Sequence, residues 1–410
     1  MVNIRIHRGA NQIGGTCIEL ACNDSRLLLD IGLPLDGDSA DPTLMPDIGD
    51  PIPLGVVVSH SHLDHYGLLH RMPDSVPVLM GEASRRIVST AAPFTGQPLP
   101  HLSGPSLRDR ETIELGPFRI TPYLVDHSAF DAYSLLIEAG GKRIFYSGDI
   151  RSHGRKSALV KRLVADPPTD IDLLFLEGSS LTRLEDANRF PSESELEDTL
   201  VTKLKDTTGL ALLHTSAQNI DRLVTCYRAA LKTDRVMVID LYAAAILEAA
   251  GSRHIPQSEW GNVRLYVPEA QRRQIKRLGC FELLARHSRN RIHRSGLKAL
   301  APRAIMLFRP LMMNDLDQSV CLKGARYFYS QWAGYLENGS YDSTITWLRQ
   351  NDIPLDHLHT SGHATPHDLK ALATALAPKT LVPIHSFAPE KFPTLFDNVV
   401  RHSDGEWWQA

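Results

Sequence analysis

The stretch that decides the fold is Val57–Leu69, VVSHSHLDHYGLL, in which three histidines and one aspartate within six positions follow an apolar run. The β-branched valines predict a buried strand, and the residues after the polar cluster predict the start of a helix. The cluster is therefore expected in the loop between the strand and the helix. Alternate side chains of an extended segment share one face, so His60 and His62 can reach one metal ion together. Asp64 and His65 then turn toward a second ion.

The composition of the chain is that of an ordinary globular protein. A length of 410 residues allows two domains with hydrophobic cores. Hydrophobic residues make up 43% and charged residues 22% of the sequence, which argues against disordered and fibrous classes. The first residues show no secretory signal pattern, and no apolar run reaches membrane-spanning length. We therefore expect a cytoplasmic protein without a membrane partner.

The polar cluster needs additional ligands from elsewhere in the chain. Imidazole and carboxylate without thiolate suit zinc or a similar divalent ion in an open, catalytic site. Four residues cannot complete two such sites, so more ligands must follow downstream. His127 comes after FRITPYLV, Asp149 after RIFYSG and His385 after TLVPI, and each of these runs predicts a strand. Strand ends are where α/β layers place their chemistry, so we expect these residues to join the cluster.

These motifs resemble the metallo-β-lactamase superfamily, whose HxHxDH signature is similar to residues 60–65. LLLDIG around Asp30 and the three downstream motifs occur in the order used by that superfamily. The resemblance implies two zinc ions, with manganese or another divalent ion as an alternative, and a supporting role for Asp30, which would orient ligands without binding metal. The implied ligands are His60, His62 and His127 for one ion, Asp64, His65 and His385 for the other, and Asp149 as a bridge.

Three further motifs point to one branch of this superfamily. Glu177 in LFLEGSS, His363 in HTSGHA and His385 in VPIHS are similar to motifs A, B and C of the β-CASP subfamily, which cleaves nucleic acids. Within that subfamily the chain resembles the ribonuclease J family without its C-terminal domain. It also departs from that family in the residues after His385, where PIHSFAPEKF replaces the expected continuation.

The resemblance implies an α/β protein, a four-layer αββα sandwich interrupted by an insert. Alternating strand and helix patterns in residues 212–251 predict that the insert is a parallel α/β domain. A Pro- and Ser-rich helix start near Phe190 marks its beginning. We place the metallo-β-lactamase domain at residues 1–189 and 345–410, and the β-CASP insert at residues 190–344.

The implied function is a zinc-dependent phosphodiesterase that cleaves RNA to 5′-phosphate and 3′-hydroxyl ends with a metal-bridged hydroxide. Asp64 helps to orient the attacking oxygen, and His363, oriented by Glu177, protonates the leaving oxygen. RNA-processing members of the β-CASP subfamily usually have histidine at motif C, whereas DNA-repair members tend to have valine. The resemblance at His385 therefore favours RNA over DNA. Open alternatives are a DNA nuclease of the same subfamily, a small-molecule ester or lactone metallo-hydrolase, and a non-catalytic scaffold. The endonuclease or exonuclease mode is also open.

A basic segment supports a single-stranded nucleic acid as partner. The segment from Arg272 to Arg303 contains ten Arg and Lys residues against the single Glu282, in a chain of net charge −3. Such clustering is typical of a surface that follows phosphates, and a solvated helix face is the alternative. A homo-oligomer is left open. The expected substrate contacts are Ser216, Asn219 and Arg222 at a predicted helix start, and Ser361 and Gly362 in motif B.

Overall fold

The computed structural model describes residues 1–183 and 189–410. These residues divide into two compact units, each described by itself below. The first unit comprises residues 1–92, 96–190 and 361–410, and the second unit comprises residues 93–95 and 191–360. Within the described ranges, no helix is both long enough and apolar enough to cross a bilayer.

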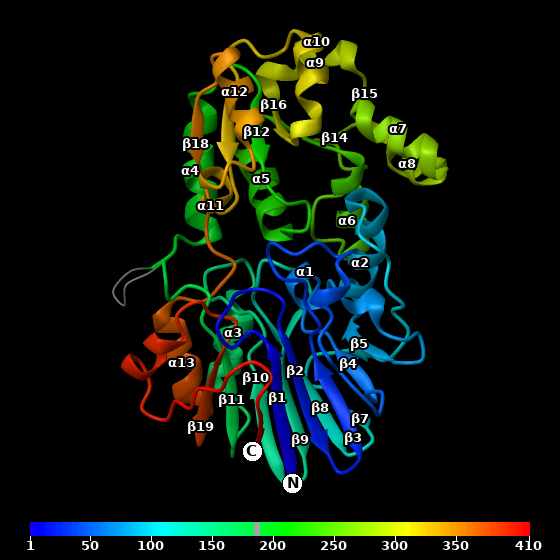
Figure 1. Cartoon of the computed structure of the whole chain (residues 1–410). Helices are drawn as coiled ribbons and strands as arrows, with labels where there is room; N and C mark the ends of the chain where they lie inside the picture. The colour runs from blue at the N-terminus through cyan, green and yellow to red at the C-terminus, as the bar shows by residue number, and fades with distance from the viewer. Residues whose placement is uncertain (184–188) are drawn as a thin grey trace. The chain divides into compact units, whose positions relative to one another are not determined.

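The first unit is built on two sheets (Figure 1). In edge-to-edge order, the strands of one sheet are β20 (Trp407–Gln409), β1 (Val2–Arg8), β2 (Cys17–Cys22), β3 (Ser25–Leu29), β4 (Gly55–Val57), β5 (Val78–Gly81) and β6 (Ser106–Leu107). Those of the other are β19 (Thr380–Ile384), β11 (Leu173–Glu177), β10 (Lys142–Tyr146), β9 (Ala132–Ala139), β8 (Phe118–Val125) and β7 (Ile113–Leu115). β9 and β10 form an antiparallel hairpin around Gly140 and Gly141.

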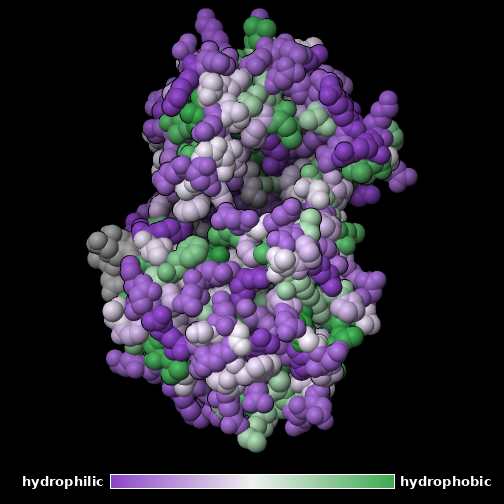
Figure 2. All heavy atoms as spheres, in the orientation of Figure 1, coloured by the Kyte–Doolittle hydropathy of each residue, from purple (hydrophilic) through white to green (hydrophobic). Residues whose placement is uncertain are grey.

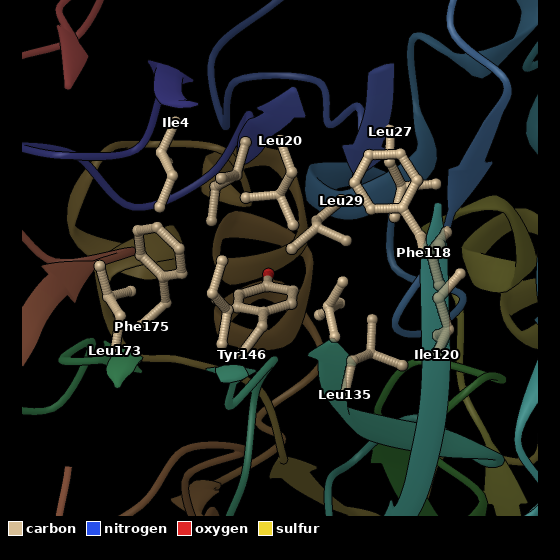
Figure 3. Packing of buried hydrophobic residues seen from close by; sticks show 14 of the residues in the cluster. Ile4, Leu20, Leu27, Leu29, Phe118, Ile120, Leu135, Tyr146, Leu173 and Phe175 are labelled. Carbon is tan, nitrogen blue, oxygen red and sulfur yellow. The ribbon is translucent and has the colours of Figure 1, made fainter. Parts of the chain in front are cut away.

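The two sheets pack face to face over one hydrophobic core. Figure 3 shows Ile4, Leu20 and Leu29 of the first sheet opposite Tyr146 and Phe175 of the second. All five side chains are buried, because alternate residues of a strand point to the same face. Burying one large apolar side chain stabilises the fold by about 1.5–3 kcal/mol, so this layer fixes the register of both sheets.

Helices cover the outer faces of both sheets. α1 (Leu63–Tyr66) and α2 (Glu82–Thr95) contribute side chains to a core with the outer face of the first sheet. α3 (Ser157–Ala165) and α13 (Pro366–Leu376) do the same on the second sheet. The order of layers is therefore helix, sheet, sheet, helix, which confirms the predicted αββα sandwich.

Four strands of the second sheet run in the same direction, so the candidate functional residues at their carboxyl ends lie on the same side of the sheet. β10 pairs in parallel with β11, and β11 pairs in parallel with β19. β8 and β10 are both antiparallel to β9, so β8 runs in the same direction as the other three. His127, Asp149 and His385 follow the ends of β8, β10 and β19, and Glu177 is the last residue of β11. The carboxyl ends of these strands thus bring together residues that are far apart in the sequence.

The second unit contains a parallel sheet, as predicted for the insert. Its strands, in edge-to-edge order, are β15 (Arg291–Ile292), β14 (Val263–Tyr266), β13 (Val236–Ile239), β16 (Ala304–Leu307), β12 (Ala211–His214), β17 (Arg326–Tyr329) and β18 (Leu355–His357). Each neighbouring pair is parallel. The helices are α4 (Glu193–Lys205), α5 (Ile220–Lys232), α6 (Leu241–Ala249), α7 (Glu269–Leu278), α8 (Phe281–His287), α9 (Arg294–Leu300), α10 (Met313–Ser319), α11 (Gly334–Glu337) and α12 (Asp342–Gln350).

The second unit continues to Thr360, past the insert boundary that the sequence placed at residue 344. α12 and β18 account for the difference. Trp347 and Leu348 of α12 are buried in the core of this unit, and β18 pairs with β17. α4 begins after Ser192, which forms a capping box with Glu195, where the sequence predicted a helix start.

Candidate metal centre

The polar cluster spans a change from extended to helical backbone. His60 and His62 lie before α1, and the backbone at His62 is extended. Asp64 and His65 lie inside α1, so their predicted loop placement is wrong. The helix begins one residue after His62, as soon as the extended backbone ends. This change of conformation divides the cluster into two groups that face different partners.

The first group consists of three histidines, His60, His62 and His127. Nδ1 of His62 lies 3.2 Å from Nε2 of His60 and 3.1 Å from Nε2 of His127. Burial lowers the pKa of His60 and His127 well below the usual value, with neighbouring imidazoles adding to the effect. Burial also lowers the pKa of His62 to about 4. Three neutral imidazoles, the form that binds metal, therefore face one point.

The second group consists of Asp64, His65, Asp149 and His385. Oδ2 of Asp149 lies 3.2 Å from Nε2 of His65 and 3.7 Å from Nε2 of His385. The same oxygen lies 3.8 Å from Nε2 of His60 and of His127 in the first group. Asp149 therefore faces both groups, which is the position that a bridging ligand requires.

The atoms that face each other in the second group lack hydrogen-bond partners. Among the described residues, both carboxylate oxygens of Asp149 and Nε2 of His65 and His385 are buried without a partner. An unsatisfied buried polar atom costs about 1–3 kcal/mol, so several in one place call for an explanation. A cation would satisfy all of these atoms, and imidazole with carboxylate suits zinc or a similar divalent ion. The residues present thus fit the metal ions that the sequence predicted.

The charges of the second group favour a proton on His65. Burial opposes the charged form of Asp149, but His385 and His65 outweigh burial and hold the pKa of Asp149 well below its usual value. Burial likewise opposes the charge of His65, yet Asp149 and Asp64 raise the pKa of His65 well above its usual value. Metal binding at His65 must therefore displace this proton.

Hydrogen bonds to Nδ1 orient the imidazoles of the second group. Nδ1 of His65 donates to Oδ2 of Asp30 at 2.8 Å, and Asp30 also accepts from Ser59 and Tyr146. Asp30 thus occupies the supporting position that we expected for it. Nδ1 of His385 is hydrogen-bonded to Oγ1 of Thr16 at 2.8 Å. No local sequence pattern marks Thr16, because the contact joins residues 369 positions apart.

Removing the Thr16 hydroxyl should weaken metal binding. In Thr16→Val the side chain keeps its size, but Nδ1 of His385 loses its partner, so we expect metal affinity to fall about tenfold. Competition with a chromogenic chelator measures the affinity. Thr121→Val, which removes an exposed hydroxyl bonded to Thr112, is the matched control and should leave affinity unchanged. Equal affinity in both variants would show that Thr16 does not support the site.

The backbone carbonyls of Ser361 and Gly362 accept hydrogen bonds from side chains of the site. Ser361 is buried, and its carbonyl accepts hydrogen bonds from Arg151 at 3.1 Å and from His153 at 2.9 Å. The carbonyl of Gly362 accepts from Nδ1 of His127 at 2.6 Å, which turns Nε2 of that ring toward the first group. Both carbonyls therefore position side chains of the site, and the substrate contacts expected of Ser361 and Gly362 stay a prediction.

His363 lies beside Asp149 and Glu177. Its Nδ1 is 3.3 Å from Oε2 of Glu177 and 3.7 Å from Oδ2 of Asp149. Burial opposes protonation, but Glu177 and Asp149 outweigh burial and raise the pKa of His363. Glu177 is fully buried and accepts hydrogen bonds from the backbone N–H groups of Ile150, Ser179 and Ala364. A buried, fixed carboxylate therefore faces an imidazole whose side chain is 20% exposed.

Gly32 permits a close approach between the loop after β3 and α1. A Cβ at position 32 would lie 1.7 Å from the backbone oxygen of Asp64. Backbone hydrogen bonds from Ile31 to His65 and from Leu33 to Leu63, both 2.9 Å, fasten this loop to α1. The residues around Asp30 and the α1 ligands are thus one packed assembly.

Replacing Gly32 by alanine should disturb this assembly. The new methyl group would overlap backbone rather than a flexible side chain, so we expect a loss of about 3 kcal/mol in the free energy of unfolding, with weaker metal binding. Denaturant unfolding of the metal-free chain measures this loss. Gly261→Ala is the control, because its Cβ meets nothing within 4 Å. If Gly32→Ala unfolded at the same denaturant concentration as wild type, α1 would have moved to accommodate the methyl group without loss of stability, and the prediction would be wrong.

The predicted substrate contacts in the second unit are partly corrected. Arg222 is 0% exposed, and its guanidinium donates to the carboxylate of Glu193 and the carbonyl of Leu358. It is therefore a buried structural residue and has no group free for a phosphate. Asn219 caps α5 by accepting from the backbone of Arg222 at 3.1 Å. Ser216 is exposed, so its predicted contact stays a prediction.

Comparisons with known proteins find a family model and several relatives that match the chain. Residues 26–202 match a family model described as a beta-lactamase superfamily domain. The chain is 27% identical over 228 residues to an RNase J-like protein of Methanocaldococcus jannaschii, covering 50% of this chain and 49% of that protein. It is 22% identical over 405 residues to ribonuclease J of Helicobacter pylori, and this match covers 92% of this chain and 55% of that protein. The chain thus spans about half the length of these curated relatives.

A solved structure extends the likeness over the whole chain. The crystal structure of a protein of unknown function from Enterococcus faecalis V583 aligns with a TM-score of 0.78 and 22% identity over 99% of both chains. The family match to residues 26–202 and the order of the motifs make the chain similar to the metallo-β-lactamase superfamily. The chain is also similar to the ribonuclease J-like proteins, as the β-CASP motifs predicted.

Proposed function

We propose that the chain is a metal-dependent phosphodiesterase that cleaves single-stranded RNA to 5′-phosphate and 3′-hydroxyl ends. The observation that carries this proposal is the convergence of two His and Asp groups whose buried, facing atoms lack partners, with His363 and Glu177 beside them. The relatives named ribonuclease J support RNA as the substrate. We propose zinc as the metal, with manganese or another divalent ion as the alternative.

The ligand roles follow the two groups. His60, His62 and His127 would hold one ion, Asp64, His65 and His385 the other, and Asp149 both. When bound, such ions lower the pKa of a water molecule and stabilise negative charge on a phosphate. The chain itself fixes the ring directions of His65, His127 and His385 through the partners of Nδ1, so these ligands are arranged before metal and substrate arrive.

The remaining side chains handle the attacking water and the proton. Hydrolysis forms a bond from a water oxygen to phosphorus and breaks the bond from phosphorus to the 3′ oxygen, which then needs a proton. The side chain of Asp64 is 18% exposed and can accept a hydrogen bond from the attacking water. His363 can give its proton to the leaving 3′ oxygen, and Glu177 would keep the ring directed toward it. The products then carry a 5′-phosphate and a 3′-hydroxyl.

Paired digestion of labelled single-stranded RNA and DNA of one sequence tests the proposal. Wild type should cleave the RNA, with ends mapping to 5′-phosphate and 3′-hydroxyl, and Asp64→Ala should be slower by at least about 100-fold. Faster cleavage of DNA would favour the DNA nuclease. Turnover of an ester or lactone with neither nucleic acid cleaved would favour the small-molecule hydrolase. Undiminished cleavage by Asp64→Ala would mean that the site is misplaced.

A further inference from the structure

The basic segment from Arg272 to Arg303 forms an exposed part of the second unit. It comprises α7, α8, the short helix η3 (Ser288–Asn290), β15 and α9. All ten Arg and Lys side chains of the segment except that of Arg291 are exposed. Figure 2 shows mostly hydrophilic residues with some hydrophobic ones at α7 and α8, and Figure 1 shows these helices projecting from the sheet of their unit. The roles proposed above use none of these residues.

A cavity of about 440 Å³ lies at this segment. Its walls come from the end of α6, the loop that follows α6, and the residues of α8 and η3. Cavities of 300–1,000 Å³ are typical of small-molecule sites, so this one can take a group of nucleotide size. Its polar lining includes Arg253, Gln257, Ser258, Arg286, His287 and Arg289.

Hydrogen bonds hold the walls in place without a ligand. The amide of Gln257 donates to three carbonyls, those of Leu247, Ser252 and Ile255. Oγ of Ser258 is 2.8 Å from Nδ1 of His287, which joins the loop to α8. The amide of Asn290 donates to the carbonyls of Ser258 and Trp260, which joins the loop to η3. A site built in this way loses little freedom when a ligand binds.

The charges and polar atoms of the cavity suit an anion. Three arginines line it against two glutamates, and one arginine, Arg286, pairs with Glu248 at 3.1 Å. Arg253 and Arg289 are exposed and make no ion pair with any described residue. His287 is 4% exposed, and its Nε2 lies 3.5 Å from the Glu248 carboxylate without a hydrogen bond to any described residue. The guanidinium of Arg253 donates from Nε to Nε2 of His254 at 3.5 Å. The cavity thus combines the exposed guanidinium groups of Arg253 and Arg289 with the buried polar side chains of Ser258 and His287.

We propose that this cavity binds one nucleotide of a single-stranded RNA. The guanidinium groups of Arg253 and Arg289 have the planar donors that match phosphate oxygens, and Ser258 and His287 supply polar contacts for the ribose or base. Flanking exposed cations continue the path for neighbouring phosphates. Phe281, 58% exposed in the same segment, offers a ring on which a base can stack. The choice of RNA rests on the proposed function, but nucleotide binding here requires no metal.

Fluorescence anisotropy with a labelled oligouridylate, in EDTA to prevent cleavage, tests the proposal. The double variant Arg253→Ala/Arg289→Ala should bind about tenfold more weakly, and its plot of log affinity against log salt should lose roughly 0.7 of slope per lost phosphate contact. The charge-matched control is Lys205→Ala/Arg349→Ala, which removes two exposed cations of the same unit outside the basic segment. The control should lose less than about twofold.

A second variant distinguishes binding inside the cavity from general attraction of RNA by positive charge. His287→Gln keeps the net charge at neutral pH, so it should weaken binding about threefold with an unchanged salt slope. Competition by adenosine monophosphate with the oligouridylate would support the single-nucleotide site. Equal losses of oligouridylate affinity in the arginine variant and its control would overturn the proposal that the cavity binds a nucleotide, even if wild type cleaves RNA. A loss of affinity in the arginine variant alone, with a wild type that cleaves no RNA, would overturn the proposed function and leave the cavity proposal in place.

Discussion

Asp149→Ala should lose its bound divalent metal and at least about 1000-fold in turnover. Asp149 is the residue that faces both ligand groups, and its Oδ2 lies within 3.8 Å of one nitrogen from each of four proposed ligand histidines. Changes to residues that merely orient ligands already cost about 10–100-fold in metal affinity, so losing the shared ligand should cost more. Metal analysis of the purified protein and single-turnover cleavage of labelled RNA measure the two effects.

Asp172→Ala is the matched control for this experiment. Asp172 lies at the opposite end of β11, where it accepts from the backbone of Arg143 and from Lys379. Its removal deletes a carboxylate from the same sheet without touching the candidate metal centre. We expect full metal content and near wild-type turnover in the control. Retention of stoichiometric metal by Asp149→Ala would disprove the shared-ligand role.

His363→Ala should keep its metal and lose at least about 100-fold in turnover. A positioned general acid contributes typically 10²–10⁴-fold, and His363 combines a raised pKa with partial exposure. Truncation leaves the Nδ1 partners of the metal-facing imidazoles in place, so metal content should not change. Metal analysis and single-turnover rates again provide the measurement.

A rescue experiment distinguishes proton donation from a structural role. Added imidazole should restore part of the turnover of His363→Ala, because it can occupy the space left by the ring and deliver a proton. His357→Ala, at an exposed histidine of β18, should behave as wild type with or without imidazole. Asp149, Glu177 and His363 could also hold a cation together, so loss of metal from His363→Ala would identify His363 as a ligand instead.

The ligand groups were predictable because their signal is local. The spacing of residues 60–65 and the position of His127, Asp149 and His385 after strand-like runs depend only on neighbours in the sequence. The parallel order of β8, β10, β11 and β19 then brings those strand ends together. Asp64 and His65 lie in α1 and not in the predicted loop, because this helix of four residues is too short for a periodic pattern to reveal.

The supporting contacts were not predictable, because they join distant segments. Thr16 reaches His385, and Arg151 reaches the carbonyl of Ser361 across 210 positions. Arg222 illustrates the opposite error. A helix start with an arginine is typical of an anion site, but the buried carboxylate of Glu193 binds this guanidinium inside the unit. Whether a cation faces solvent or another chain segment is decided by tertiary packing, which no local pattern records.

The place of β19 in the second sheet has a consequence for how the protein is made. Every proposed metal ligand except His385 is synthesised before residues 191–360 of the second unit. β19, which precedes His385, pairs with β11, and residues 191–360 lie between these two strands in the sequence. Pairing over such a separation is slow unless the intervening segment has already become compact. A ribosome that stalls inside the second unit would therefore hold a nascent chain with three imidazoles of one site ready and the other site unfinished. Binding of both proposed metal ions accordingly belongs to the last moments of synthesis or to the time after release.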